Sequence, residues 1–168
     1  MAAPHARPYL ASVRFLRVVL SLVLALGILL GTSGEAFAKN ATLDITLIEF
    51  KSSVDKKGQK RIARTIRRQA HRAAKHLDFG VKGRVEVTFL VRDIQVVEED
   101  DVVTVTCTLV GRLKGGGSAR SKIRFGGKPD KNNKVERQVV TAATEGVLTR
   151  LAQLSRERAR EDKKADAS

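Results

Sequence analysis

Four segments of the chain alternate between apolar and polar side chains, the pattern of strands that bury one face. The first alternating run extends from Leu43 to Leu47, and the second covers 85–96. The third covers 103–109 and the fourth covers 119–125. We therefore expect four strands, each with one row of apolar side chains turned to a common core.

The acidic stretch 98–101 (Glu-Glu-Asp-Asp) separates the second predicted strand from the third. A four-residue loop there pairs Val96 with Val103. Farther from the loop this register pairs apolar positions with polar ones. One extra residue at 92–93 restores the pairing of apolar with apolar positions. We therefore expect a β-bulge at 92–93, because a bulge inserts one residue into one strand of a pair.

Three consecutive glycines at 115–117 separate the third predicted strand from the fourth and indicate a flexible turn. Continuing the apolar register across this turn pairs Cys107 with Phe125. Cys107 then lies in the inward row of a central strand, where a lone thiol behaves as a small apolar side chain. We expect it to be buried and unreactive; a disulfide to a partner chain is the alternative.

Two segments have the three- and four-residue apolar spacing of amphipathic helices. The first runs from about Lys56 to Asp78, with Gly80 placed to cap its C-terminal end. The second starts near Val135. Their apolar stripes consist of Ile62, Ile66, Ala70, Ala73 and Leu77 in the first, and Val140, Ala143, Val147, Leu151 and Leu154 in the second.

The predicted order of elements is β-α-β-β-β-α. Two helices with one apolar stripe each can cover one face of a four-stranded sheet, so we expect an α+β fold with two layers. The first helix would connect the first two strands as a crossover if those strands are parallel.

Residues 1–38 have the three parts of a secretory signal peptide. Three arginines precede the apolar run 18–31, and Ala36-Phe37-Ala38 is a small-x-small cleavage site. The run is shorter than the roughly 20 residues that span a bilayer. We expect export by the general secretory route to the periplasm or the exterior, with Lys39 as the new first residue; an uncleaved signal anchor is the alternative. The exported part is then one domain, 39–154, followed by a charged, disordered tail, 155–168.

The whole chain carries 32 Lys and Arg against 18 Asp and Glu, a net charge of +14. Residues 39–168 alone hold 29 basic and 17 acidic residues, a net charge of +12. Such an excess favours polyanionic partners through long-range attraction. Aromatic residues for base stacking and zinc-finger patterns are missing, so sequence-specific recognition of nucleic acid is not expected.

The first predicted helix concentrates this charge, with nine Lys or Arg between 56 and 78 and a single acid, Asp78. On a helical projection most of them fall opposite the apolar stripe. We take six as candidate anion-binding residues: Lys57, Lys60, Arg64, Arg67, Arg68 and Lys75. A second basic group lies on the fourth predicted strand and its flanking loops: Lys114, Arg120, Lys122, Arg124, Lys128, Lys131 and Lys134. A solvated face without a ligand is the alternative for both.

Residues that could carry catalysis or bind metal are few. His71 and His76 are five positions apart, so they do not share a helix face as metal ligands at i and i+4 would. The acids at 98–101 lack the alternating spacing of a calcium loop. We expect no catalytic residue, no metal and no cofactor. We therefore expect that the protein is not an enzyme.

The order of elements behind a signal peptide resembles small periplasmic domains of two kinds. These are the lipoprotein activators of penicillin-binding proteins and the amino-terminal domain of the Tol-system protein TolB. The resemblance covers residues 41–154 in element order, without a shared motif and without the lipid-anchored cysteine of the activators. It implies a role in cell-envelope assembly or scaffolding. Because catalytic residues are also missing, we expect an exported, non-catalytic binding or assembly module of the cell envelope. The charge supports the alternative, a binder of an anionic polymer or of lipid head groups through the helix at 56–78.

Overall fold

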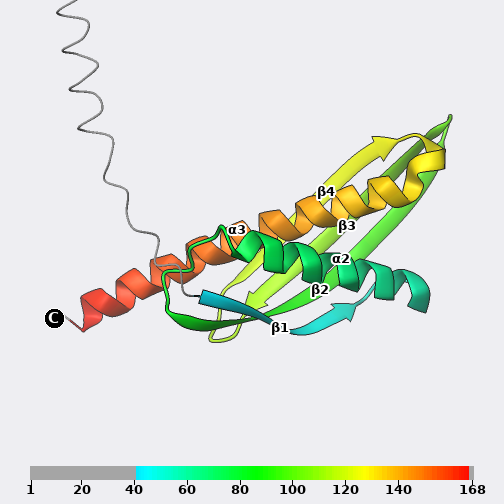
Figure 1. Cartoon of the computed structure of the whole chain (residues 1–168). Helices are drawn as coiled ribbons and strands as arrows, with labels where there is room; N and C mark the ends of the chain where they lie inside the picture. The colour runs from blue at the N-terminus through cyan, green and yellow to red at the C-terminus, as the bar shows by residue number, and fades with distance from the viewer. Residues whose placement is uncertain (1–40, 167–168) are drawn as a thin grey trace, which may run out of the picture. The chain divides into compact units, whose positions relative to one another are not determined.

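The computed structural model describes residues 41–166 (Figure 1). The predicted signal peptide and its cleavage site lie outside these residues. Within the described part, no helix is long and apolar enough to span a membrane. The elements follow in the order β1 (Ala41–Phe50), α2 (Lys56–Ala74), β2 (Gly83–Glu99), β3 (Val102–Leu113), β4 (Ser118–Gly127), the short 3-10 helix η1 (Pro129–Lys131) and α3 (Asn132–Ala165).

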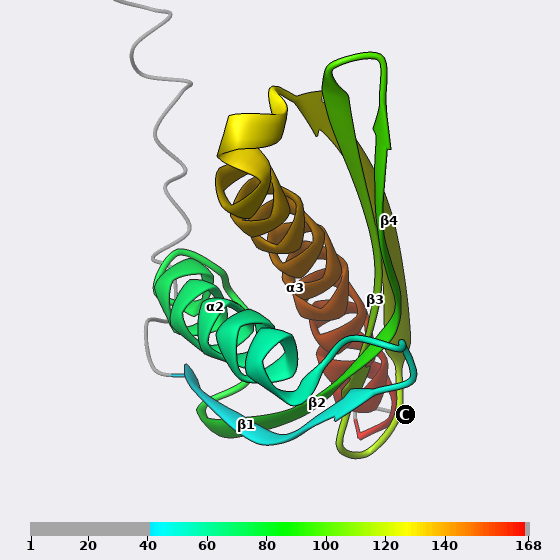
Figure 2. The same ribbon diagram turned by 90° about the vertical axis from the view of Figure 1, so that its right-hand side faces the viewer.

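The four strands form one sheet in the order β1-β2-β3-β4. Strand β1 runs parallel to β2, while β2, β3 and β4 are antiparallel neighbours. Both helices lie on the same face of this sheet (Figure 2). The predicted α+β architecture, with the order β-α-β-β-β-α, is confirmed.

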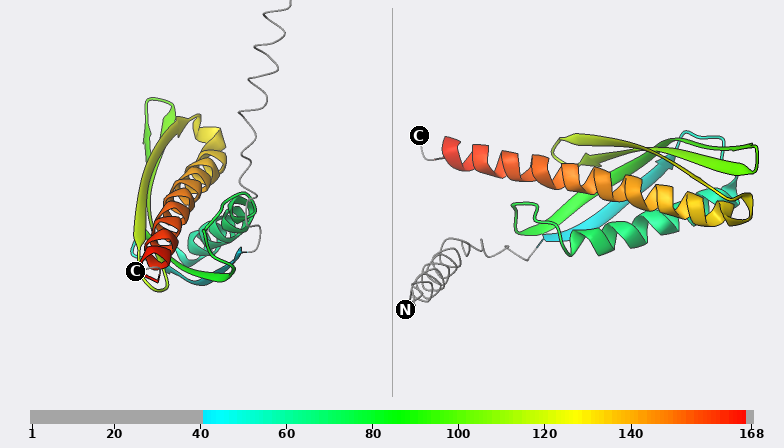
Figure 3. Two further views of the ribbon diagram at one scale, coloured as in Figure 1. Left: turned by 90° about the vertical axis from the view of Figure 1, so that its left-hand side faces the viewer. Right: turned by 90° about the horizontal axis from the view of Figure 1, so that it is seen from above.

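The core lies between the sheet and the two helices. Ile62, Ile66 and Ala70 of α2 are buried, as are Val147 and Leu151 of α3, so both predicted apolar stripes face inward. The two helices run in the same direction along the sheet (Figures 1 and 3). Their polar faces therefore lie next to each other on the outside of the helix layer.

Strand β1 does not keep the predicted alternation to its end. Its register with β2 shifts between Ile45 and Leu47, which marks an irregularity at Thr46. The shift turns Leu47 to solvent, where it is 47% exposed, and brings Ile48 and Phe50 against the core instead. The prediction that Leu47 is buried is wrong, because one extra residue in a strand reverses the faces of all that follow.

The β2–β3 hairpin confirms the bulge and corrects the register. The pairing shifts between Val91 and Asp93, as expected. However, the loop has two residues instead of four, so Glu99 pairs with Val102 and Val96 pairs with Val105. Asp100 and Asp101 both have positive φ, 45° and 61°. Two such residues form the tight turn that matches strand twist, and Asp tolerates this conformation better than most side chains.

The β3–β4 register is also displaced by two residues from the prediction. Cys107 pairs with Ile123 instead of Phe125. The turn closes through the hydrogen bond from Leu113 N to Gly117 O, 3.0 Å, which centres it on Gly115. An even displacement leaves every side chain on its predicted face, so the predicted core is unaffected.

The prediction of a disordered tail at 155–168 is wrong for residues 155–165, because α3 continues to Ala165. The extension has little apolar surface, but it is held by the glycine turn between β3 and β4. Arg158 Nη1 donates to Gly115 O and Gly116 O at 2.5 and 2.8 Å. The backbone and stem of Arg156 lie against Gly80, where a Cβ would be 2.9–3.4 Å from them.

Candidate anion-binding surface

Helix α2 begins at a side-chain cap and is anchored on one face. Asp55 Oδ1 accepts from Gly58 N at 3.1 Å, and Gln59 Nε2 donates to Val54 O at 2.8 Å. The first bond satisfies one of the N–H groups that the first helical turn leaves free, and the second fixes the carbonyl of the residue before the cap. Gly58 is required by the close packing of this cap, because a Cβ there would lie 2.5 Å from Val54 Cγ1.

The helix ends earlier than predicted, at Ala74. Gly80 does not cap it. Instead, Gly80 adopts a φ of +70° in the following turn, where its N–H donates to Asp78 Oδ1 at 2.8 Å. This turn places Phe79 in the core at 1% exposure. The chain therefore leaves the helix one turn early in order to bury an aromatic ring.

Five of the six predicted candidates lie on the exposed side of α2, and the sixth, Lys75, is its exposed C-cap residue. We call the six the basic ridge: Lys57, Lys60, Arg64, Arg67, Arg68 and Lys75. None has an ion pair or side-chain hydrogen bond with a residue of the described range 41–166. Helix α2 itself contains no acidic residue. From Lys57 to Lys75 the ridge extends about 27 Å at 1.5 Å per residue.

Two contacts fix α2 against α3. Arg61 Nε donates to Glu136 Oε1 at 3.0 Å, and Arg61 Nη2 donates to Glu136 Oε2 at 2.7 Å. These hydrogen bonds raise the pKa of the Arg61 guanidinium, opposed in part by burial. Gln69 Nε2 donates to Glu145 Oε1 at 2.6 Å. The groove between the two helices is therefore held at two points, one near its start and one two turns further along.

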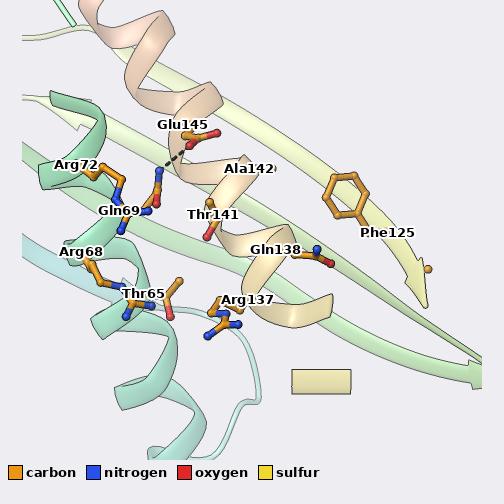
Figure 4. Close-up of a pocket in the computed structure, with 11 residues that line it drawn as sticks. Thr65, Arg68, Gln69, Arg72, Phe125, Arg137, Gln138, Thr141, Ala142 and Glu145 are labelled. Carbon is orange, nitrogen blue, oxygen red and sulfur yellow. Dashed lines mark hydrogen bonds between the residues drawn. The ribbon is translucent and has the colours of Figure 1, made fainter. Parts of the chain in front are cut away.

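That groove has a volume of about 710 Å³ and lies beside the ridge (Figure 4). Arg68 and Arg72 of α2 form one wall, and Arg137 of α3 reaches it from the other side. Its remaining lining includes the polar side chains of Gln138 and Thr141 and, at the β4 end, Phe125 and Gly126. Arg68 belongs to both the ridge and the groove, so the two form one continuous surface.

The groove has an excess of positive charge. Its three arginines make no ion pair or side-chain hydrogen bond with any residue among 41–166. The carboxylate of Glu145 is its one acidic lining group in this part of the chain, and it accepts from Gln69. Guanidinium groups present planar pairs of donors that match carboxylate and phosphate oxygens. The groove can therefore hold an anionic group between the helices.

Four members of the second predicted basic group, Lys114, Arg120, Lys122 and Arg124, do not join this surface, whereas Lys131 and Lys134 line a hollow together with Arg137. Arg120, Lys122 and Arg124 alternate with the buried Ala119 side of β4, so they lie on the sheet face away from the helices. There Lys122 and Arg124 border a hollow of about 620 Å³ that acidic residues, Asp93 among them, also line. Lys114 is paired with Glu86 at 3.0 Å. These cations are partly offset by neighbouring acids, unlike the basic ridge.

The remaining candidates lie apart from one another. Cys107 is 1% exposed, as predicted, and burial raises the pKa of its thiol to about 12. His71 and His76 are exposed on and just after α2. Residues 41–166 contain no group of three His, Cys, Asp or Glu side chains able to hold a metal ion.

Sequence reasoning found the ridge but missed the groove. Arg72 and Arg137 were not among the candidates, because the sequence does not indicate which sides of the two helices face each other. One signal was available: Arg137 and Thr141 are polar positions in the first turns of a helix whose other side is apolar. They become neighbours of Arg68 only because the helices pack in parallel.

No protein-family model matches the chain, and no curated protein matches it. Among solved structures, a candidate lipoprotein from Caulobacter crescentus CB15 is 11% identical with a TM-score of 0.39, covering 66% of this chain and 90% of its own. A candidate neuraminyllactose-binding hemagglutinin homologue from Helicobacter pylori is 10% identical with a TM-score of 0.36, covering 77% and 91%. A Xanthomonas campestris protein of family DUF330 is 12% identical with a TM-score of 0.32, covering 79% and 92%. Structural similarities this low do not indicate a function for this chain.

Proposed function

We propose that this protein is an exported, non-catalytic binding module that holds a polyanionic chain along the basic ridge of α2. One observation carries the proposal. The six cations of the basic ridge have no counter-ion among the described residues, and the opposite face of their helix is buried in the core. Ion contacts of this kind are long-ranged and weaken as salt is added.

The groove favours an extended polymer over a flat membrane surface. A bilayer can contact the convex ridge, but its head groups do not enter a groove between two helices. A flexible chain can follow the ridge and place one of its anionic groups between Arg68, Arg72 and Arg137. The ridge then supplies most of the attraction, and the groove adds directed hydrogen bonds.

The test compares two variants that remove the same charge from different faces. The ridge variant changes Lys60, Arg64, Arg67 and Lys75 to Gln, and the sheet variant changes Arg120, Lys122, Arg124 and Lys128 to Gln. Heparin serves as the polymer probe and phosphatidylglycerol vesicles as the membrane probe, both at low salt. Circular dichroism checks that both variants keep the fold, which we expect because all eight side chains lie outside the buried core.

We expect the ridge variant to lose about a thousandfold in affinity for heparin, because each cation near a fixed anion contributes on the order of 1 kcal/mol. The sheet variant should lose far less. Equal losses would show that binding follows net charge alone and would contradict the proposal, as would a wild-type protein that heparin does not retain at low salt.

A third variant distinguishes binding to the polymer from binding to the membrane. Changing Arg72 and Arg137 to Gln should weaken heparin binding and leave vesicle binding nearly unchanged. If this variant binds heparin like the wild type, the groove takes no part. If vesicles are bound much more tightly than heparin, the ligand is a membrane surface.

A second candidate function, assembly with envelope proteins through apolar contacts, is favoured by the valines that the β2–β3 hairpin exposes: Val96 at 47%, Val97 at 44% and Val102 at 48%. Apolar interfaces resist salt, whereas contacts of the ridge do not. Recovery of bound envelope components at low and high salt therefore distinguishes the two.

A further inference from the structure

Strand β4 lies at an edge of the sheet. It pairs with β3 on one side, and no strand among residues 41–166 pairs with its other side. Figure 1 shows β4 at the margin of the sheet opposite β1. Helix α3 contacts β4 from the inner face of the sheet, where a Cβ on Gly146 would lie 3.1 Å from Ser121 Oγ. The outer edge of β4 is therefore open to another strand.

The free backbone groups at this edge belong to the basic residues of β4. The β3–β4 turn closes through the bond from Leu113 N to Gly117 O, so these two residues form a hydrogen-bonded pair. Bonded and non-bonded pairs alternate along an antiparallel ladder, and residues of a non-bonded pair turn their N–H and C=O groups away from each other. Counted from Gly117, the non-bonded positions of β4 include Arg120, Lys122 and Arg124. These three residues therefore direct their N–H and C=O groups to the open edge.

The side chains of the same three residues form a row of cations on the open face of the sheet. No acid lies opposite them on β3, where their partners are Val110, Thr108 and Thr106. None of the three has an ion pair with a residue of the range 41–166. The acids of β2 on this face, Asp93 among them, lie two strand spacings away, about 10 Å. A strand added to the edge of β4 lies at half that distance, so its acids can pair with this row directly.

The other face of β4 favours apolar side chains. Ile123 and Phe125 point to the helix side of the sheet, because Cys107 and Val105 opposite them are buried. Ile123 is only partly buried, and Phe125, which also borders the groove beside α3 (Figure 4), is 42% exposed. Apolar side chains on a neighbouring strand pack beside such residues and cover them. The edge therefore fits a strand in which acidic and apolar residues alternate.

We propose that β4 binds an extended polypeptide segment of another protein, antiparallel to it, in which acidic residues alternate with apolar ones. The acids of this segment lie directly opposite Arg120, Lys122 and Arg124, and its apolar side chains lie beside Ile123 and Phe125. In this mode of recognition the main-chain hydrogen bonds give affinity, and the alternate side chains give specificity. The basic ridge takes no part, so this proposal is independent of polyanion binding.

Charge argues against a second copy of this chain as the occupant. Strand β4 contains no acidic residue, so an antiparallel pairing of β4 with β4 brings cations together without a counter-charge. Like charges directly opposite each other destabilise a strand pair, and natural sheets use such charges to prevent edge-to-edge association. A polysaccharide is not favoured either, because it lacks the alternating N–H and C=O groups of a strand.

Fluorescence anisotropy with the purified protein and a labelled, capped peptide tests the proposal. The probe peptide alternates three glutamates with four valines, and the control peptide has the same composition with its glutamates together. We expect the alternating peptide to bind at least about tenfold more tightly, because only it places acids and valines on opposite faces. The ridge variant with Lys60, Arg64, Arg67 and Lys75 changed to Gln should bind it like the wild type. Loss of binding in that variant would place the peptide on the ridge and overturn the proposal.

Two substitutions at Lys122 distinguish the backbone from the charge. Lys122→Gln removes the cation and keeps the N–H that faces the edge, whereas Lys122→Pro removes both. Proline is tolerated in an edge strand where its nitrogen faces solvent, so the pairing with β3 should persist, which circular dichroism checks. We expect the proline variant to bind the alternating peptide about fivefold more weakly than the glutamine variant, through loss of one hydrogen bond. Equal affinities would overturn the proposal.

A modified peptide makes the same test without changing the protein. Methylating the backbone nitrogen of the central glutamate removes the N–H that donates to the carbonyl of Lys122. Methylating an adjacent valine instead changes an N–H that faces away from β4. The first change should weaken binding about tenfold and the second should have little effect. Equal effects, or a wild type that does not bind the alternating peptide, would overturn the proposal and leave the edge cations only the role of keeping copies apart.

Discussion

Arg61 of α2 and Glu136 of α3 form a two-point ion pair across the helix layer, with N–O distances of 3.0 and 2.7 Å. The Glu136 side chain is 11% exposed and the Arg61 side chain is 50% exposed. The pair joins the helices at the end where both begin, and it leaves Arg68, Arg72 and Arg137 as the unpaired cations of the groove.

Changing Glu136 to Gln should lower the free energy of unfolding by about 1–2 kcal/mol. Removing one partner leaves the other charge without compensation, but water reaches half of Arg61 and limits the cost. Urea denaturation measures the effect. Glu49→Gln is the matched control, because Glu49 is exposed and makes no ion pair with the described residues. Similar stability of the two variants would contradict a structural role for the pair.

Gly111 allows α3 to approach β3 closely. A Cβ at this position would lie 2.5 Å from Val147 Cγ1 and 3.0 Å from Leu151 Cδ1, and both side chains are fully buried. Gly111→Ala should therefore destabilise the fold by about 1–3 kcal/mol, the usual cost of overpacking a core. Gly126→Ala is the control, since a Cβ there comes no closer than 3.5 Å to Val102 Cγ1. Equal unfolding temperatures for the two variants would show that α3 can move away from β3 at little cost in stability.

Burial of Cys107 makes stability depend on pH at alkaline values. Desolvation raises the pKa of the thiol from 9.0 to about 12 in the folded chain. The contribution is fully present below pH 9. Between pH 9 and about pH 12 the unfolded thiol loses its proton while the folded one keeps it, so stability falls, by up to about 1.4 kcal/mol per pH unit.

Unfolding curves of the wild type and of Cys107→Ala across this range isolate the effect, because the two proteins differ only at this side chain. The wild type should lose stability more steeply. A thiol reagent should also modify Cys107 only slowly without denaturant. Parallel pH profiles or rapid modification would contradict the burial of this side chain in solution.

The alternation of apolar residues was enough to predict the architecture. Strands and helices differ in period, and Leu109 or Ile66 reaches the core whatever the detailed pairing. The bulge at 92–93 was also predictable, because the apolar parity of β2 changes there. The irregularity at Thr46 was not, since Leu47 and Ile48 are both apolar and either could face inward.

Hairpin registers were only partly determined by the sequence. A four-residue and a two-residue loop at 98–101 place the same side chains on the same faces, so the apolar pattern cannot choose between them. The left-handed backbone conformation of Asp100 and Asp101 produces the two-residue loop. Likewise, the charged stretch after Leu154 lacks an apolar stripe, and its helix depends on contacts to the glycine turn at 115–117.

The basic ridge follows from the sequence alone, because the period of a helix places residues opposite a buried stripe on the outside. The groove does not, since it depends on how two helices pack. The parallel packing of α2 and α3 brings Arg72 and Arg137, 65 positions apart, to one groove. The open edge of β4 likewise follows from the strand order, which places β4 at the margin of the sheet. Local periodicity determined which side chains are outside; only the tertiary structure decided which of them are neighbours.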